Sequence, residues 1–167
     1  YLVDNAEQVV ALEFDRDLAR QLPKKVKADN LTVHEADCLT FDYTSLPASY
    51  KVVANIPYYL TSNLLRVLSE SSNPPSVIAL LIQKEVAERV AAAPGAMSLL
   101  SVSVQLYYQA KLCEVVKAEL FTPPPKVDSQ IISLVRREQP LFDDLDHKKF
   151  FRIVKAGFSQ RRKKLRS

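Results

Sequence analysis

The sequence predicts an α/β fold with a mostly parallel, doubly wound sheet, and three observations lead to this prediction. Short apolar runs alternate along the chain with segments of helical periodicity, as in repeated strand–helix units. One run, residues 77–82, is apolar throughout, which is typical of a strand buried on both faces. The chain has 167 residues, 47% of them hydrophobic, and is therefore long enough to bury one sizeable core.

The first predicted strand ends in an acidic residue. Residues 9–14 form an apolar run that contains Glu13, and residues 15–22 have helical periodicity, which Pro23 is expected to end. A carboxylate at the carboxyl end of such a strand commonly accepts hydrogen bonds from two ribose hydroxyl groups. Glu13 is therefore a candidate ribose ligand, and the alternative is a solvated carboxylate.

The second predicted strand, residues 31–37, alternates apolar and polar side chains and stops at Asp37 and Cys38. Taken alone, Asp37 is interpreted as a turn or cap residue. Cys38 and Cys113 are predicted to be buried free thiols. The two histidines, His34 and His147, have no spacing that suits a metal site.

Residues 54–62 connect a third apolar run, residues 50–53, to a helical pattern at residues 62–70. This position predicts a turn at the carboxyl end of a strand. One interpretation is an ordinary strand-to-helix turn, in which Thr61 or Ser62 caps the helix.

The other interpretation is a receptor for a flat base that carries an exocyclic amine. The side-chain oxygen of Asn55 can accept a hydrogen bond from such an amine. Pro57 disfavours the helical conformation at Ile56, so the Ile56 carbonyl is available as a second acceptor. Tyr58 then offers a ring face on which the base stacks.

A second informative stretch, residues 121–129, lies between the strand-like runs 112–117 and 130–136. Three consecutive prolines, residues 123–125, impose an extended backbone, so Phe121 is expected to be presented by a stiff loop. A proline-rich linker is the alternative. Further helices are predicted at residues 83–93 and 97–109.

Beyond Glu138 the composition changes, which predicts a domain at residues 1–138 followed by a linker and one helix at residues 139–167. The helix ends in a basic run that includes Arg161, Arg162, Lys163 and Lys164; a solvated tail is the alternative interpretation. The net charge of +4 and the pI near 9.0 permit a polyanionic partner. No apolar run is long enough to predict a membrane span.

Asn55-Ile56-Pro57-Tyr58 resembles the Asn-(Asp/Pro/Ile/Leu)-Pro-Tyr motif of amino methyltransferases that use S-adenosylmethionine. The stretch Phe-Thr-Pro-Pro-Pro-Lys-Val-Asp-Ser at residues 121–129 is similar, residue for residue, to a loop of the bacterial ribosomal RNA adenine dimethyltransferases. Both motifs occur in the order found in that family, and the resemblance extends from about Val9 to Arg166. Asn63 departs from it, because many members have proline there.

The resemblance implies a Rossmann-like class I methyltransferase sheet with one antiparallel strand near its edge, at residues 130–136. It also implies a central first strand followed by a glycine-rich cofactor loop. The chain begins at Tyr1, has Met97 as its only methionine, and contains only Gly95 and Gly157 as glycines. We therefore expect a fragment without that strand and loop, with two exposed strand edges, and with only the start of a C-terminal helical domain.

The resemblance also implies roles for individual residues. The expected cofactor ligands are Glu13 for the ribose, Asp37 for the adenine amine of the cofactor, and Asn55. The target adenine is expected to contact Asn55, Ile56, Pro57 and Tyr58, with Phe121 on its other face. The expected RNA contacts are Lys126, Arg161, Arg162, Lys163 and Lys164.

The function implied is transfer of methyl groups from S-adenosylmethionine, without a metal, to N6 of two adjacent adenines near the 3′ end of small-subunit rRNA. The expected setting is ribosome biogenesis in the cytoplasm, by a monomer acting on a pre-ribosomal particle, with this fragment inactive alone. One alternative is a large-subunit rRNA methyltransferase of the macrolide-resistance type. The sequence Pro-Pro-Lys-Val-Asp at residues 124–128 argues against this alternative. The other is a noncatalytic RNA-binding module for ribosome assembly, which the missing glycine-rich loop favours.

Overall fold

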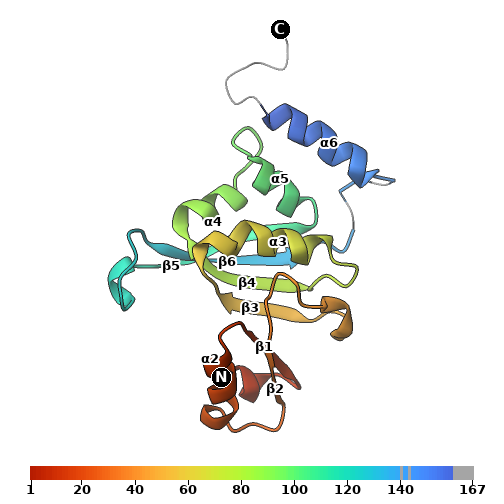
Figure 1. Cartoon of the computed structure of the whole chain (residues 1–167). Helices are drawn as coiled ribbons and strands as arrows, with labels where there is room; N and C mark the ends of the chain where they lie inside the picture. The colour runs from red at the N-terminus through yellow and green to blue at the C-terminus, as the bar shows by residue number, and fades with distance from the viewer. Residues whose placement is uncertain (140, 143, 160–167) are drawn as a thin grey trace. The chain divides into compact units, whose positions relative to one another are not determined.

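The computed structural model describes residues 1–139, 141–142 and 144–159, and has the predicted α/β class (Figure 1). By their internal contacts the residues form two compact units, Tyr1–Ser45 and Leu46–Ser167, called here the first and second units. Strands β1 and β2 form a two-stranded sheet, and the remaining strands form a separate four-stranded sheet. The predicted domain boundary at residues 138 and 139 stays a prediction.

The first unit is a strand–helix–strand arrangement in which β1 and β2 are parallel. Val9 lies opposite Leu31, and the register continues to the end of both strands. Asp15 caps α2, because its Oδ1 accepts hydrogen bonds of 2.9 Å from the N–H groups of Asp17 and Leu18. The elements are α1 (Leu2–Asn5), β1 (Val9–Glu13), α2 (Arg16–Lys25), β2 (Leu31–Glu35) and the 3₁₀ turn η1 (Tyr43–Ser45).

Helix α2 continues through Pro23 to Lys25, so the prediction that Pro23 ends the helix is wrong. A proline lacks one N–H donor, but it leaves the pairing of the residues after it possible. Here the N–H of Val26 donates to the Leu22 carbonyl at 2.8 Å, so helical hydrogen bonding resumes beyond the proline.

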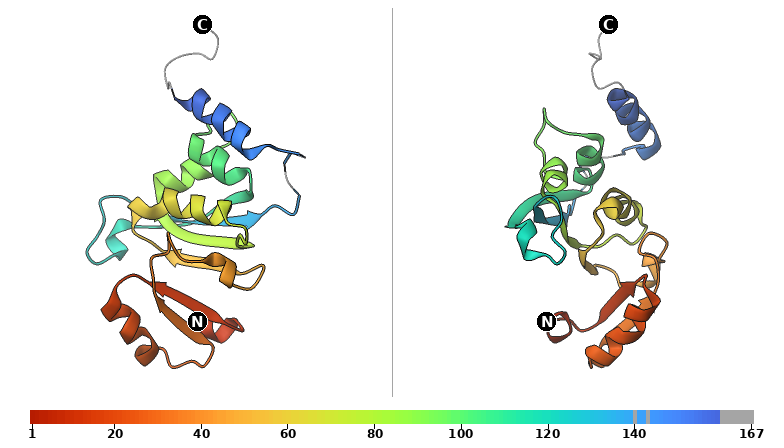
Figure 2. Two further views of the ribbon diagram at one scale, coloured as in Figure 1. Left: turned by 45° about the vertical axis from the view of Figure 1, so that its right-hand side comes forward. Right: turned by 60° about the vertical axis from the view of Figure 1, so that its left-hand side comes forward.

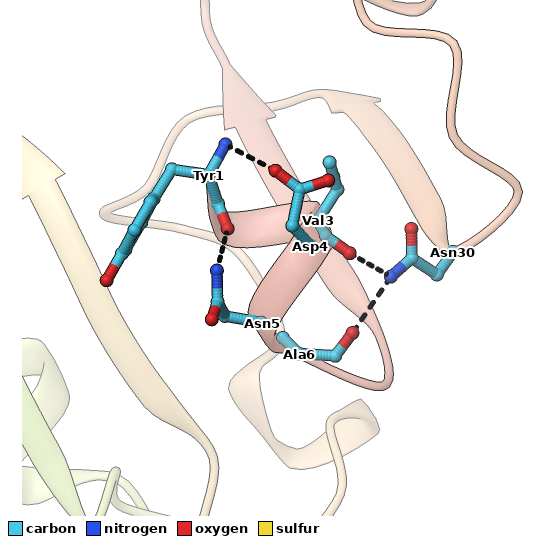
Figure 3. A network of polar contacts seen from close by, with 6 residues as sticks. All are labelled: Tyr1, Val3, Asp4, Asn5, Ala6 and Asn30. Atoms are coloured by element: carbon cyan, nitrogen blue, oxygen red, sulfur yellow. Dashed lines mark hydrogen bonds and ion pairs between the residues drawn. The ribbon is translucent and has the colours of Figure 1, made fainter.

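Asn30 joins the end of α1 to the start of the sheet (Figure 3). Its side-chain amide donates to the carbonyl oxygens of Val3 at 2.9 Å and Ala6 at 2.8 Å. The backbone carbonyl of Asn30 accepts from the N–H of Val9 at 2.8 Å. The side chain therefore satisfies carbonyl groups that a helix end leaves without partners, and the backbone fixes where β1 begins.

The second unit contains the four-stranded sheet, with strand order β3-β4-β6-β5. Strands β3 and β4 are parallel, and β6 is antiparallel to both β4 and β5. This confirms the antiparallel strand expected near the edge at residues 130–136. The strands are β3 (Lys51–Asn55), β4 (Val77–Gln83), β5 (Tyr108–Val116) and β6 (Ser129–Arg136).

Helices α4 and α5 pack on this sheet, α3 packs against α5, and α6 lies beyond α5 (Figures 1 and 2). No helix within the described residues has the length and apolar character that crossing a membrane requires. The helices are α3 (Thr61–Glu70), α4 (Lys84–Val90), α5 (Leu99–Gln105) and α6 (His147–Phe158), and the short 3₁₀ turns are η2 (Tyr58–Leu60) and η3 (Ala118–Leu120).

Two predicted boundaries around α5 are wrong, and side-chain hydrogen bonds explain both. Helix α4 ends at Val90 rather than at residue 93, because the Gln105 side chain donates to the carbonyls of Val90 at 2.6 Å and Ala92 at 2.9 Å. Strand β5 begins at Tyr108, inside the predicted helix, because the Tyr108 ring is fully buried and its hydroxyl donates to the Pro75 carbonyl at 3.1 Å.

The core of the second unit lies between the sheet and its helices. Strand β4 buries alternate residues completely, Ile78, Leu80 and Ile82, while its other face is only half-buried. The expectation of burial on both faces therefore holds for one face. Cys113 is exposed, so the prediction of a buried thiol is wrong there, because the residue lies in an irregularity of β5 at the sheet edge.

Candidate functional site

Asn55 is the last residue of β3, and its side chain is exposed at the carboxyl end of the strand. The chain then remains extended, with Pro57 at φ −53° and ψ 132°, before the 3₁₀ turn η2 begins at Tyr58. The Pro57 carbonyl accepts from the N–H of Leu60 at 3.0 Å. The predicted strand-ending turn is confirmed.

Helix α3 follows this turn without a side-chain cap. Its N-cap residue is Leu60, and Thr61 is already helical. The Thr61 side chain is only 2% exposed, and its hydroxyl has no hydrogen-bond partner among the described residues. The interpretation of the turn as a helix start capped by Thr61 or Ser62 is therefore wrong.

Tyr58 joins this turn to the proline-rich loop. Its hydroxyl lies 2.7 Å from the hydroxyl of Ser129, a residue 71 positions later and completely buried at the start of β6. Ser129 lies opposite Gln83, the last residue of β4. The structure therefore brings together two motifs that are far apart in the sequence.

The loop between η3 and β6 is anchored by Asp128. The Asp128 carboxylate accepts from the N–H of Ala118 at 2.9 Å and pairs with the Lys117 ammonium at 3.0 Å. Phe121, half-buried, follows η3 directly, and the Thr122–Pro123 peptide bond is cis. These contacts close the base of the loop that carries Phe121.

The same contacts shift the acidity of both side chains. The hydrogen bond from the Ala118 N–H, with that from Lys117, lowers the pKa of Asp128 below its usual range. The Asp128 carboxylate correspondingly raises the pKa of Lys117. Both groups are therefore charged at neutral pH.

In the first unit, Glu13 and Asp37 lie at the carboxyl ends of two neighbouring parallel strands. Glu13 ends β1, and its Oε1 accepts from the N–H of Asp15 at 2.9 Å. Asp37 follows β2 by two residues, and its Oδ1 accepts from the N–H of Leu39 at 2.8 Å. Within the part of the chain that the structure describes, no hydrogen bond reaches the second oxygen of either carboxylate. Each acid therefore has an oxygen available to a ligand donor.

The predicted turn role of Asp37 is confirmed by its bond to Leu39 and by its carbonyl, which accepts from the N–H of Phe41 at 3.0 Å. Lys126 is exposed in the proline-rich loop. The predicted RNA contacts Arg161, Arg162, Lys163 and Lys164 lie outside the described residues. Across residues 1–139, 141–142 and 144–159, no group of three or more His, Cys, Asp or Glu side chains is placed to hold a metal ion.

Sequence reasoning missed two features of the second unit. It gave no role to Asp128 and Ser129, although they end the quoted loop motif. It also missed an open groove of about 1590 Å³ between α3, α5 and α6, which we call the basic groove. Its charged lining residues are Arg66, Glu70, Arg89, Lys148, Arg152 and Lys155. Among the described lining residues one acid faces five bases, and a helix-by-helix reading does not reveal this excess because the bases come from α3, α4 and α6.

The chain is similar to known proteins over its whole length. The family model described as ribosomal RNA adenine dimethylase matches residues 1–167. The chain is 42% identical to ribosomal RNA small subunit methyltransferase A of Streptococcus gordonii, over 99% of this chain and 60% of that protein. It is 38% identical to the protein of the same name from Nitrosospira multiformis, over 99% of this chain and 65% of that protein.

Two solved structures have the same fold. A dimethyladenosine transferase from Plasmodium falciparum superposes with a TM-score of 0.85 and 28% identity, over 98% of this chain and 60% of that one. The 23S rRNA methyltransferase ErmE superposes with a TM-score of 0.81 and 31% identity, over 95% of this chain and 64% of that one.

Proposed function

Because the chain belongs to the ribosomal RNA adenine dimethylase family, we propose that it transfers methyl groups to N6 of two adjacent adenines near the 3′ end of small-subunit rRNA. The chain spans 60% and 65% of the length of the two curated relatives described above, so the activity, substrate and partners of the whole protein are all part of this proposal. The observation that carries it is the hydrogen bond between Tyr58 and Ser129, which links the two motifs of the family.

The target adenine would bind at the turn after β3. The Asn55 side-chain oxygen and the Ile56 carbonyl would accept hydrogen bonds from its amine, with Pro57 holding the backbone extended. Two such acceptors favour a pyramidal nitrogen, whose lone pair is no longer delocalised into the ring. The amine then becomes a better nucleophile without a general base, because positioning and charge stabilisation are sufficient, and after the N–C bond forms the nitrogen loses one proton to solvent.

Tyr58 and Phe121 would stack on the two faces of the base. Taking an adenine out of its stack costs about a few kcal/mol, and stacking on an aromatic side chain returns about 1–3 kcal/mol per base. The two rings therefore offset most of the cost of extruding the target.

The cofactor of this reaction would be S-adenosylmethionine, which supplies a methyl group bonded to a positively charged sulfur. The residues present fit its polar groups, since the second oxygens of Glu13 and Asp37 suit hydroxyl and amine donors. Glu13 would bind the ribose and Asp37 the adenine amine of the cofactor, and Asn55 is a third proposed cofactor ligand. No metal is part of the proposal.

The RNA partner would be held by positive charge. Lys126 is exposed five residues after Phe121, and the basic groove supplies further cations for phosphate groups. Arg161, Arg162, Lys163 and Lys164 are further proposed RNA contacts, in a C-terminal region that we propose begins at residue 139. We propose that the protein acts as a monomer on a pre-ribosomal particle in the cytoplasm.

A large-subunit substrate is the second candidate, because ErmE, named as a 23S rRNA methyltransferase, has the same fold at 31% identity. The identities of 42% and 38% to proteins named for the small subunit favour the first candidate. A noncatalytic RNA-binding module is the third candidate, and a methyl-transfer assay separates it from the other two.

The test uses the chain alone and a chimeric protein, in which residues 1–167 replace the matching segment of the Streptococcus gordonii relative. Each is incubated with labelled S-adenosylmethionine and with small- or large-subunit particles that lack the modification. We expect the chimeric protein to label adenines of small-subunit rRNA. Labelling of large-subunit rRNA would establish the second candidate, and RNA binding without labelling would establish the third.

Asn55→Ala in the chimeric protein tests the site itself. We expect methyl transfer to fall about 100-fold, the usual effect of losing one group that stabilises a transition state, with RNA affinity unchanged. Gln109→Ala is the matched control, because it removes an exposed carboxamide on β5. An equal loss of activity in both variants would remove Asn55 from its proposed role.

A further inference from the structure

The two rings proposed to hold the target base come from different segments of the second unit. Tyr58 follows β3, and Phe121 lies in the loop before β6. Each belongs to a short turn rather than to a long helix or strand. A base can stack on both rings only if the two turns are fixed relative to each other.

Ser129 fixes the first ring. Its hydroxyl lies 2.7 Å from that of Tyr58, and its own position is set by the pairing of β6 with β4, where it lies opposite Gln83. Ser129 is 0% exposed, so water does not compete freely for this hydrogen bond. The Tyr58 ring is therefore held at its outer end as well as at the backbone.

Asp128, the preceding residue, anchors the turn that leads to the second ring. Its side chain holds the N–H of Ala118 and the ammonium of Lys117, and Ala118 begins the turn that leads to Phe121. Its carbonyl accepts from the N–H of Lys84 at 3.0 Å, at the start of α4. Asp128 is therefore tied both to the loop and to the helix that follows β4.

We propose that Asp128 and Ser129 are positioning residues that tie Tyr58 and Phe121 to one point at the start of β6 and so set both rings for a stacked adenine. This proposal rests on the proposed function, because the stacked base is its substrate. It assigns no contact with the base to either residue. Their effect passes through the two rings.

The test compares Tyr58→Phe, Ser129→Ala and the double variant in the chimeric protein. Each single variant removes one partner of the same hydrogen bond, so we expect kcat to fall about five- to tenfold in each. The double variant should lose no more than either single variant, because the interaction is already absent. The KM for cofactor and the thermal midpoint should stay near their original values. If Ser129 had only a structural role, the loss of its hydroxyl would change these two quantities as well.

Stacking is measured separately with an RNA that carries 2-aminopurine at the target position, whose fluorescence reports its stacking. We expect the fluorescence change on binding to be reduced by Ser129→Ala and by Asp128→Ala. Ser133→Ala is the matched control, since it removes a hydroxyl from the same strand four residues later. It should leave both kcat and fluorescence unchanged.

The outcomes separate the two proposals. Unchanged kcat and fluorescence in Ser129→Ala, or losses that multiply in the double variant, would overturn the positioning role. If the unsubstituted chimeric protein transfers no methyl group, the proposed function fails. In that case, a fluorescence change that is reduced by Ser129→Ala still supports the positioning role. A fluorescence change that Ser129→Ala leaves unaltered overturns it.

Discussion

The candidate residues of the two units are held in different ways. In the first unit, Glu13 and Asp37 each accept a hydrogen bond from a backbone N–H two residues later. In the second unit, Tyr58 bonds to Ser129 across 71 residues, and Asp128 to Ala118 across 10. The first arrangement forms wherever the local turn forms, whereas the second exists only once the sheet has assembled. The acids at the strand ends are therefore oriented by neighbouring residues, while the positions of Tyr58 and Phe121 depend on the fold of the whole second unit.

The largest effect that tests this comparison is expected at Glu13 and Asp37, the proposed cofactor ligands. Glu13→Gln and Asp37→Asn keep an oxygen for the local N–H but remove the charge from the oxygen proposed to bind the ligand. We expect the affinity of the chimeric protein for S-adenosylmethionine to fall about tenfold in each, as for loss of a charged hydrogen-bond partner. The measurement is calorimetric titration.

Glu35→Gln is the matched control for Glu13→Gln. Glu35 lies directly opposite Glu13 in the neighbouring strand, and its carboxylate is 3.8 Å from the Arg16 side chain. Its substitution should leave cofactor affinity unchanged. If it weakens binding as much as Glu13→Gln, general charge rather than a ribose contact explains the effect.

A smaller effect is expected at Asp15, whose hydrogen bonds stabilise only the start of α2. Asp15→Ala removes the cap of α2 and should lower the stability of that helix by about 1 kcal/mol. Asp17→Ala removes an acid of the first turn that makes no capping bond, and its effect should be about 0.3–1 kcal/mol at most. Hydrogen exchange of the α2 amides measures both. Slower exchange in Asp15→Ala than in Asp17→Ala would contradict the capping role.

The sequence predicted the features that neighbouring residues determine. The positions of five strands, β1 to β4 and β6, follow from local apolar patterns, and the turn at Asn55 follows from the constraint that Pro57 places on Ile56. The pattern failed where a distant side chain decides the outcome. The end of α4 depends on Gln105, and the start of β5 depends on the buried Tyr108. Sequence reasoning missed Ser129 as a partner of Tyr58 for the same reason, because no local pattern reports a contact across 71 residues.

The smallest expected effect concerns pH and compares a local carboxylate with a long-range one. Hydrogen bonds lower the pKa of Asp42, chiefly from the Thr44 hydroxyl, and that of Asp128, chiefly from the Ala118 N–H. A carboxylate with a depressed pKa stabilises its contacts at all pH values above its ordinary pKa of 3.8, and this stabilisation disappears as the pH falls through the depressed value. The amide resonances of Thr44 and Ala118 should therefore both shift only below about pH 4.

Only the Ala118 transition should also move resonances far away in sequence, because Asp128 adjoins Ser129 and, through it, Tyr58. The Thr44 transition should stay confined to residues near Asp42. The measurement is a series of nuclear magnetic resonance spectra between pH 7 and 2.5 on the 167-residue chain. A Tyr58 ring resonance that does not follow the titration of Asp128 would mean that the loop anchor and the ring are uncoupled, and that Asp128 acts only within its own loop, as Asp42 does.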